Sequence, residues 1–315
     1  MRVTTKIISQ SLLTNLNNNL GKLQEYQDQL SSGKRLNSIS DDPAATARLL
    51  TAKSAMQAQE QYNSNMDYAG GWLDTADNAL DSAGQVLQRA TEIAVMGANG
   101  ALNKESMQAL GDEMDTLVAE MVQIGNTNYA GRYIFGGGNS ATSPFTISGQ
   151  DSDGKITTVQ FIDPAYTQDK LGETYSQKIE IASGVTIDIS VGRKTFHSSS
   201  GADDMNAIFK TMIKLREDLD NQDTNQVGSD IGLLEDQSDN ILSERATIGA
   251  KSNRVELAQS RATIYSTNLT KLVSDLEDAD IAEAATKYSS QQATYQAALS
   301  VGAKIIMPSL LDFLK

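Results

Sequence analysis

ILSERATIGAKSNRVELAQSRATIYSTNLTKLVSDLE, residues 241–277, carries an apolar residue at every seventh position without a slip. These positions are Ile241, Ile248, Val255, Ala262, Leu269 and Leu276. A second series follows three residues further on, at Ala258, Tyr265, Leu272 and Ala279. Two such series are typical of a helix that packs along its length against another helix. At 1.5 Å per residue, about 40 residues span roughly 60 Å, which is longer than a globular core requires.

A second apolar ladder lies near the start of the chain, at Leu13, Leu16, Leu20, Leu23 and Leu30. Steps of three, four, three and seven residues place these side chains in one narrow stripe on a helix. Because the two ladders stand at opposite ends of the sequence, antiparallel pairing is the simplest way to bury both. We therefore predict a mainly α fold in which both chain ends build a long antiparallel helical rod or coiled coil.

The middle of the chain has a different character. Ten of the 23 glycines fall in 131–201, and the segments 156–162 and 177–192 have the alternating pattern of strands. Ser183-Gly184 is a plausible two-residue hairpin turn within the second segment. We therefore predict a small β-rich insertion at 138–200.

Two further helix starts can be read from capping residues. Asp42 and Pro43 are predicted as the N-cap and first residue of a second helix, with Gly70-Gly71 as a candidate interruption. Asn103 is predicted to cap a third helix.

The composition of the 315 residues disfavours most catalytic and binding chemistry. The absence of Cys removes disulfides, thiolate metal sites and cysteine nucleophiles. The single histidine, His197, stands in a polar linker without an identifiable partner and is expected to be exposed. The net charge of −14 disfavours a nucleic-acid partner. We expect no catalytic residue, no cofactor and no metal site.

The acidity is concentrated in 203–244, where eleven acidic residues stand against three basic ones. We interpret this segment as a solvated helix face with its loop. A cation-binding role is the weaker alternative, because no fixed ligand spacing appears.

Nothing in the sequence suggests a membrane partner or a cleavable signal. The opening MRVTTKIISQSLLTNLNNN lacks an apolar core of even about 7 residues. No stretch approaches the roughly 20 apolar residues that would span a bilayer.

The two chain ends carry more apolar surface than two thin helices can cover within one subunit. The residues concerned are Leu12, Leu13, Leu16 and Leu20, then Ile305, Ile306, Leu310, Leu311, Phe313 and Leu314. Hydrophobic ends that need neighbours suggest polymerisation, and open head-to-tail contacts produce filaments or helical rings.

Three separated segments resemble the bacterial flagellin family, in the same order. They are LSSGKRLNSISDDPAATA (30–47), IGAKSNRVELA (248–258) and LEDADIAEAATKYSSQQATYQAALSVGAKI (276–305). Together with the first ladder, the resemblance covers about 1–137 and 205–315. Within the family, MRVTTKI (1–7), GRYIFGG (131–137) and the ending SLLDFLK resemble the branch found at the junction between hook and filament.

The resemblance implies three domains. Residues 1–40 with 280–315 would form a terminal coiled-coil domain of the inner tube, 41–137 with 201–279 a helical rod domain, and 138–200 a small outer domain. The implied subunit-packing residues are Leu13, Leu16, Leu20, Leu23, Leu30, Leu269, Leu272, Leu276, Leu299, Ile306, Leu310 and Leu314. A second set of residues matches the family's motifs and is expected to have a structural role, in capping or pairing. These residues are Arg35, Asn37, Asp41, Asp42, Pro43, Asn253 and Arg254.

The resemblance also implies a function. The chain would be a structural adaptor of the bacterial flagellum, exported through the type III channel to the outside of the cell without a cleaved signal peptide. Its partners would be copies of itself in a helical ring, a neighbouring hook-associated protein, flagellin and a cytoplasmic export chaperone. Two alternatives stay open: a filament flagellin, and an adhesive or binding module carried on 138–200.

Overall fold

A computed structural model describes residues 2–137, 140–162, 177–191 and 206–306 of the chain. The helices are α1 (Arg2–Ser32), α2 (Pro43–Gly97), α3 (Lys104–Gly125), α4 (Ala207–Asp220), α5 (Thr224–Glu277) and α6 (Ile281–Ile306). The strands are β1 (Asn128–Tyr129), β2 (Arg132–Tyr133), β3 (Phe145–Gln150), β4 (Ile156–Phe161), β5 (Lys178–Ala182) and β6 (Val185–Asp188). The predicted mainly α fold with strands between its two helical ends is confirmed. Among the described helices, none combines the length and the apolar composition that a membrane-spanning segment needs.

The chain divides into two compact units. Unit 1 comprises Met1–Gln59 and Thr263–Lys315, and unit 2 comprises Glu60–Ala262. Both boundaries fall inside helices, since α2 and α5 each contribute residues to both units. The division into terminal, rod and outer domains that the family resemblance implies stays a prediction.

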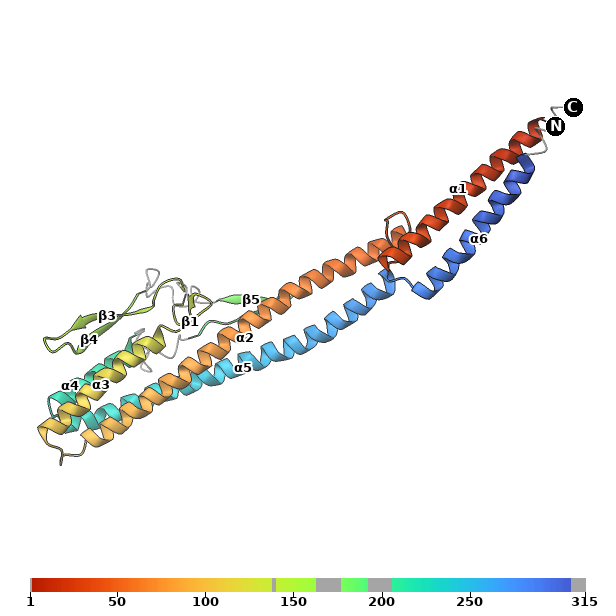
Figure 1. Cartoon of the computed structure of the whole chain (residues 1–315). Coiled ribbons are helices and arrows are strands. Elements are labelled where there is room, and N and C mark those ends of the chain that lie inside the picture. Colours follow the sequence, from red (N-terminus) through yellow and green to blue (C-terminus); the bar gives the residue numbers. More distant parts are fainter. Residues whose placement is uncertain (1, 138–139, 163–176, 192–205, 307–315) are drawn as a thin grey trace. The chain divides into compact units, whose positions relative to one another are not determined.

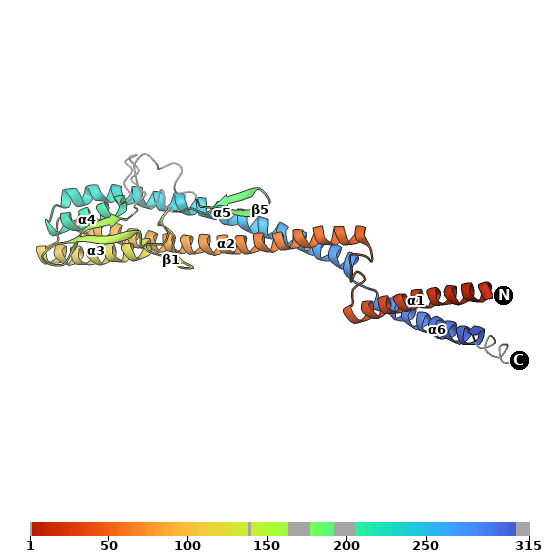
Figure 2. The same ribbon diagram turned by 90° about the horizontal axis from the view of Figure 1, so that it is seen from above.

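In unit 1 the two terminal helices lie side by side and antiparallel (Figure 1). Leu12 of α1 contacts the backbone near the end of α6, and Asn19 bonds to Gln291 closer to its start. The same pairing is visible from above in Figure 2. The predicted antiparallel pairing of the two chain ends is therefore present.

In unit 2 the apolar repeat of α5 is buried with residues of α2. Ile241, Ile248 and Val255 are at most 3% exposed, and they share one core with Trp72 and Leu80. The two helices are also tied by charge. The Arg245 guanidinium, which lies on α5, bonds to the carboxylates of Asp77 and Asp81, which lie on α2.

The predicted interruption of the second helix is wrong, because α2 runs without a break through Gly70-Gly71. Gly71 serves close packing instead. A Cβ at Gly71 would lie 2.2 Å from the hydroxyl oxygen of Tyr129, whose ring packs against Tyr68 and Trp72. A helix tolerates glycine at a cost of about 1 kcal/mol, and here the missing side chain makes room for an aromatic cluster.

The two adjacent glycines therefore provide a matched test. Gly70→Ala adds a methyl group that meets no atom within 4 Å, so we expect it to raise the free energy of unfolding by up to about 1 kcal/mol. Gly71→Ala forces Tyr129 to move, and overpacking of about 1–3 kcal/mol should outweigh the same gain in helix propensity. Urea unfolding of both variants measures the difference. Equal effects would contradict the packing role of Gly71.

In the described part of the chain the strands form three antiparallel pairs, β1–β2, β3–β4 and β5–β6. The hairpin β5–β6 turns at Ser183-Gly184 as predicted, with Gly184 at φ 70°. Side chains of the long helices hold it in place: Asn65 on α2 donates to the Glu180 carbonyl, and Lys251 on α5 to that of Ser190, both at 2.8 Å. The sequence did not single out β1, β2 or β3. His197 lies outside the described residues.

Candidate functional site: the terminal helices and their connections

The loop between α1 and α2 is folded around two of the motif residues. One carboxylate oxygen of Asp41 accepts hydrogen bonds from the backbone amides of Asn37 and Ser38, at 3.1 and 2.8 Å. The Asn37 side chain accepts from the Ser32 hydroxyl and donates to the Lys34 carbonyl. These contacts fix the path of the chain after α1 without help from a hydrophobic core.

The same loop ends in a helix cap. Oδ1 of Asp42 accepts from the amides of residues 44 and 45, at 3.1 and 2.9 Å. Pro43 opens α2 at the position where a missing N–H costs nothing. The predicted cap at Asp42 is thus present.

The end of α5 is joined to this loop by a short antiparallel bridge. The Arg35 amide donates to the Glu277 carbonyl at 2.7 Å, and the Ala279 amide donates to the Gly33 carbonyl at 2.9 Å. The Arg35 guanidinium also donates to the Leu276 carbonyl at 3.0 Å. Both connections between long and terminal helices in unit 1 are therefore bonded to each other.

A nearly buried carboxylate closes this bridge. Glu277 is 6% exposed, and its two carboxylate oxygens contact the ammonium groups of Lys34 at 2.5 Å and Lys53 at 2.7 Å. Hydrogen bonds from Lys34 and then from Lys53 hold the pKa of Glu277 below its ordinary value. Glu277 was not among the residues predicted from the sequence, because its partners are distant along the chain.

The lowered pKa of Glu277 gives the bridge a defined pH dependence. A carboxylate whose folded pKa is depressed stabilises the folded state at pH values above its unfolded pKa. That stabilisation is lost as the pH falls through the folded pKa. Hydrogen exchange of the Arg35 and Ala279 amides should therefore accelerate, relative to intrinsic rates, as the medium becomes acidic. In Glu277→Gln the Arg35 and Ala279 amides should exchange faster at neutral pH, and lowering the pH should accelerate their exchange little further. If the exchange rates of the variant depend on pH as they do in the unaltered protein, the role of the carboxylate is contradicted.

Only part of the N-terminal apolar ladder, Leu13 to Leu30, is buried where α1 packs against α6. Leu16, Leu23 and Leu30 are half-buried, whereas Leu13 and Leu20 are 57% and 39% exposed. The ladder is therefore only partly buried within a single chain, as expected for chain ends that carry more apolar surface than two helices can cover. The helix presents two apolar faces, of which the partner helix covers one.

Two contacts set how α6 lies on α1. The Gln291 side-chain amide donates to the carbonyl and side-chain oxygens of Asn19, at 3.2 and 3.1 Å. Gly302 is buried, and a Cβ there would lie 2.7 Å from a methyl carbon of Leu12. The pair therefore combines a polar register contact with close packing at a glycine.

The remaining predicted packing residues also divide into buried or half-buried side chains and exposed ones. Leu269 is buried and Leu276 half-buried, whereas Leu272 and Leu299 are 47% and 46% exposed. Leu310, Leu314 and the side chain of Ile306 lie outside the described residues. Unit 1 thus exposes Leu13, Leu20, Leu272 and Leu299 as apolar positions that its own helices leave uncovered.

The second motif lies elsewhere in the chain. Asn253 and Arg254 are exposed residues of α5 in unit 2, and Arg254 donates to the Thr186 carbonyl of β6 at 3.4 Å. This bond links Arg254 to the β5–β6 hairpin, and the structural role of the motif stays a prediction.

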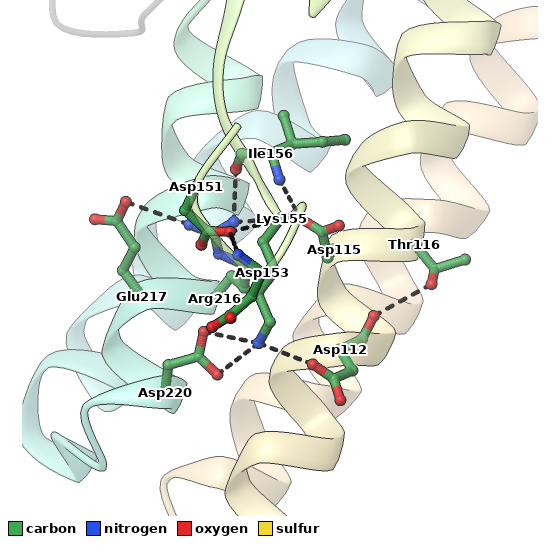
Figure 3. A network of polar contacts seen from close by, with 10 residues as sticks. All are labelled: Asp112, Asp115, Thr116, Asp151, Asp153, Lys155, Ile156, Arg216, Glu217 and Asp220. Carbon is green, nitrogen blue, oxygen red and sulfur yellow. Dashed lines mark hydrogen bonds and ion pairs between the residues drawn. The ribbon is translucent and has the colours of Figure 1, made fainter. Parts of the chain in front are cut away.

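The acidic segment is only partly the solvated face that its sequence predicts. Asp230 is 0% and Glu244 7% exposed, and the Asp230 carboxylate bonds to the Lys214 ammonium between α5 and α4. Burial raises the pKa of Asp230. Asp220 accepts from Lys155 at 3.0 Å, which holds the turn between β3 and β4 on α4 (Figure 3).

Figure 3 also shows a second anchor for β4. The Arg216 side chain is 3% exposed and donates to the Ile156 carbonyl at 2.6 Å. Asp115 on α3 accepts from the Ile156 amide at 2.8 Å and from Arg216 at 3.2 Å. These polar groups are arranged as structural anchors. No group of three or more His, Asp or Glu side chains in the described part of the chain could hold a metal ion.

Comparison with known proteins agrees with this architecture. The family model for the bacterial flagellin N-terminal helical region matches residues 3–140, and that for the C-terminal helical region matches residues 222–314. Flagellar hook-associated protein 3 of Escherichia coli is 25% identical over 305 residues, covering 94% of each chain. Flagellin of Listeria monocytogenes is 25% identical over 302 residues, covering 96% of this chain and 94% of its own.

Solved structures show the same fold. The crystal structure of flagellar hook associated protein-3 from Legionella pneumophila has a TM-score of 0.58 at 14% identity, covering 72% of this chain and 98% of that one.

Proposed function

The chain belongs to the bacterial flagellin family, and from that premise we propose that it is a structural subunit assembling at the junction between flagellar hook and filament. The full-length similarity to a hook-associated protein supports this position. We assign the chain no catalytic role.

One observation carries the assembly part of the proposal. The paired terminal helices leave Leu13, Leu20 and Leu299 exposed by 39–57% on surfaces that no other described part of unit 1 covers. Repeated apolar side chains on a helix pair are stabilised when other helices cover them. The simplest occupant of these faces is the terminal helix pair of a neighbouring copy, because every subunit carries the same two faces.

The proposal extends to location and neighbours. The subunit would lie outside the cell, exported through the flagellar type III channel without a cleaved signal peptide and escorted by a cytoplasmic chaperone. In the flagellum it would contact copies of itself in a helical ring, a further hook-associated protein and flagellin.

Filament flagellin is the second candidate, favoured by the similarity to the flagellin of Listeria monocytogenes. Adding purified protein to isolated hook–basal bodies separates the two. A junction subunit should form a short zone of limited length at the hook end, visible by electron microscopy, and should then accept flagellin. Growth of long filaments from this protein alone would contradict the junction assignment and favour the filament.

A further inference from the structure

The corner between α2 and α3 contains the sequence Asn99-Gly100, which is the single Asn-Gly pair in the chain. Both residues are exposed and follow the end of α2 at Gly97. We propose that Asn99 is a site of spontaneous deamidation, at which the chain modifies itself through a cyclic imide formed with Gly100. This inference does not depend on the proposed function.

The reaction needs no outside reagent except water. The backbone nitrogen of Gly100 attacks the side-chain carbonyl carbon of Asn99, and the side-chain nitrogen leaves as ammonia with the proton from the Gly100 amide. Water then opens the five-membered imide at one of its two carbonyls. One opening gives aspartate and the other gives isoaspartate, in which the backbone continues through the former side chain. Glycine offers the least steric resistance to this attack because it has no Cβ.

The geometry of the corner leaves the reacting groups accessible. Within the described part of the chain, the Gly100 amide makes no hydrogen bond that would have to break before attack. The Asn99 side-chain oxygen accepts a hydrogen bond from the Ala101 amide at 3.4 Å. That donor is directed at the oxygen on which negative charge develops during the attack, which lowers the barrier.

Asn37-Ser38 provides the opposite case within the same chain. The Asn37 side chain is held by Ser32 and by the Lys34 carbonyl. The Ser38 amide, which would be the attacking nitrogen, is bonded to the Asp41 carboxylate at 2.8 Å. The structure therefore protects this pair and leaves Asn99-Gly100 open.

Conversion would change the corner in two ways. The Asn99 amide donates to the Met96 carbonyl at 3.2 Å, and the Asn99 carbonyl accepts from Leu102 at 3.3 Å, so an inserted backbone carbon disturbs bonds on both sides. The new carboxylate also lies just after the C-terminus of α2, where helix carbonyls already carry partial negative charge. Both changes loosen the connection between α2 and α3.

The test is incubation of the folded full-length protein in mildly alkaline buffer containing oxygen-18 water, followed by peptide mapping. We expect labelled aspartate and isoaspartate at position 99 well before any change at Asn37. Gly100→Ala should slow the conversion about tenfold, which equals about 1.4 kcal/mol in the barrier. This variant should fold normally, because a Cβ at Gly100 meets no atom within 4 Å.

Two results would overturn the proposal. One is an intact Asn99 in protein whose Asn37 has reacted. The other is conversion of Asn99 at the same rate in Gly100→Ala, since direct hydrolysis and not imide formation would then be responsible. A circular dichroism spectrum of each sample confirms that the folded chain is being measured. In converted protein, the amides at the start of α3 should exchange faster than in fresh protein.

Discussion

Replacing Leu13 and Leu20 together with aspartate is expected to abolish incorporation of the protein into the flagellum while leaving the isolated chain folded. Both side chains are already exposed in the monomer, so the fold loses little beyond the weaker helix propensity of aspartate, about 0.5 kcal/mol per residue. In the assembly each aspartate would enter a covered apolar contact, where an unpaired charge costs several kcal/mol, about 3 or more. Addition of the variant to hook–basal bodies measures the loss.

The matched control is the double variant Asn17→Asp with Gln24→Asp. These positions are also exposed on α1, are seven residues apart like the leucines, and add the same two charges. They replace polar side chains, so assembly should largely be preserved. Equal failure of both variants would contradict a specific role for the apolar face, and normal assembly of the leucine variant would contradict the role altogether.

Asp115→Ala should strongly destabilise unit 2. It removes the carboxylate that bonds both the nearly buried Arg216 guanidinium and the Ile156 amide. Among the described residues, Arg216 would then keep only the exposed Glu217 carboxylate, at 3.4 Å, as an ionic partner, and breaking a buried ion pair costs about 3 kcal/mol. Urea unfolding should show this loss. Hydrogen exchange should accelerate first at the amides of β4, because the Ile156 amide loses its bond to Asp115.

Asp112→Ala is the control one turn away on α3. Its side chain is 68% exposed and pairs with Lys155, so its removal should cost no more than about 1 kcal/mol. The double variant Asp115→Ala with Arg216→Met should recover part of the lost stability, since the buried charge at position 216 is then absent. If the double variant is less stable than Asp115→Ala, the poorly compensated Arg216 charge is not the cause of the lost stability.

Local signals in the sequence were sufficient for most helices. The heptad series of α5 and the cap at Asp42 depend on residues close together in the chain, and both appear in the structure. The role of Gly71 was misjudged because it depends on Tyr129, a residue of another element. The glycine pair indicated a helix break because glycine has a low helix propensity, and it could not indicate an aromatic neighbour.

The candidate site was predicted less completely, for a related reason. A ladder at Leu13 to Leu30 defines the direction of an apolar stripe, but it does not say how wide a face one partner helix covers. In the structure Leu16 and Leu23 are half-buried, whereas Leu13 and Leu20 remain exposed. Glu277 was missed because a single acidic residue at a helix end gives no signal of two distant lysines.

The most direct test of the apolar face is the reactivity of a thiol placed on it. The chain has no cysteine, so Leu20→Cys carries a single reactive group. It should react readily with a maleimide in the monomer and become protected in assembled flagella. Ser152→Cys, in the exposed turn between β3 and β4, serves as the control and should react in both states. Protection at position 20 alone is the result we predict; equal labelling of Leu20→Cys before and after assembly would contradict packing of the terminal helices against neighbouring subunits.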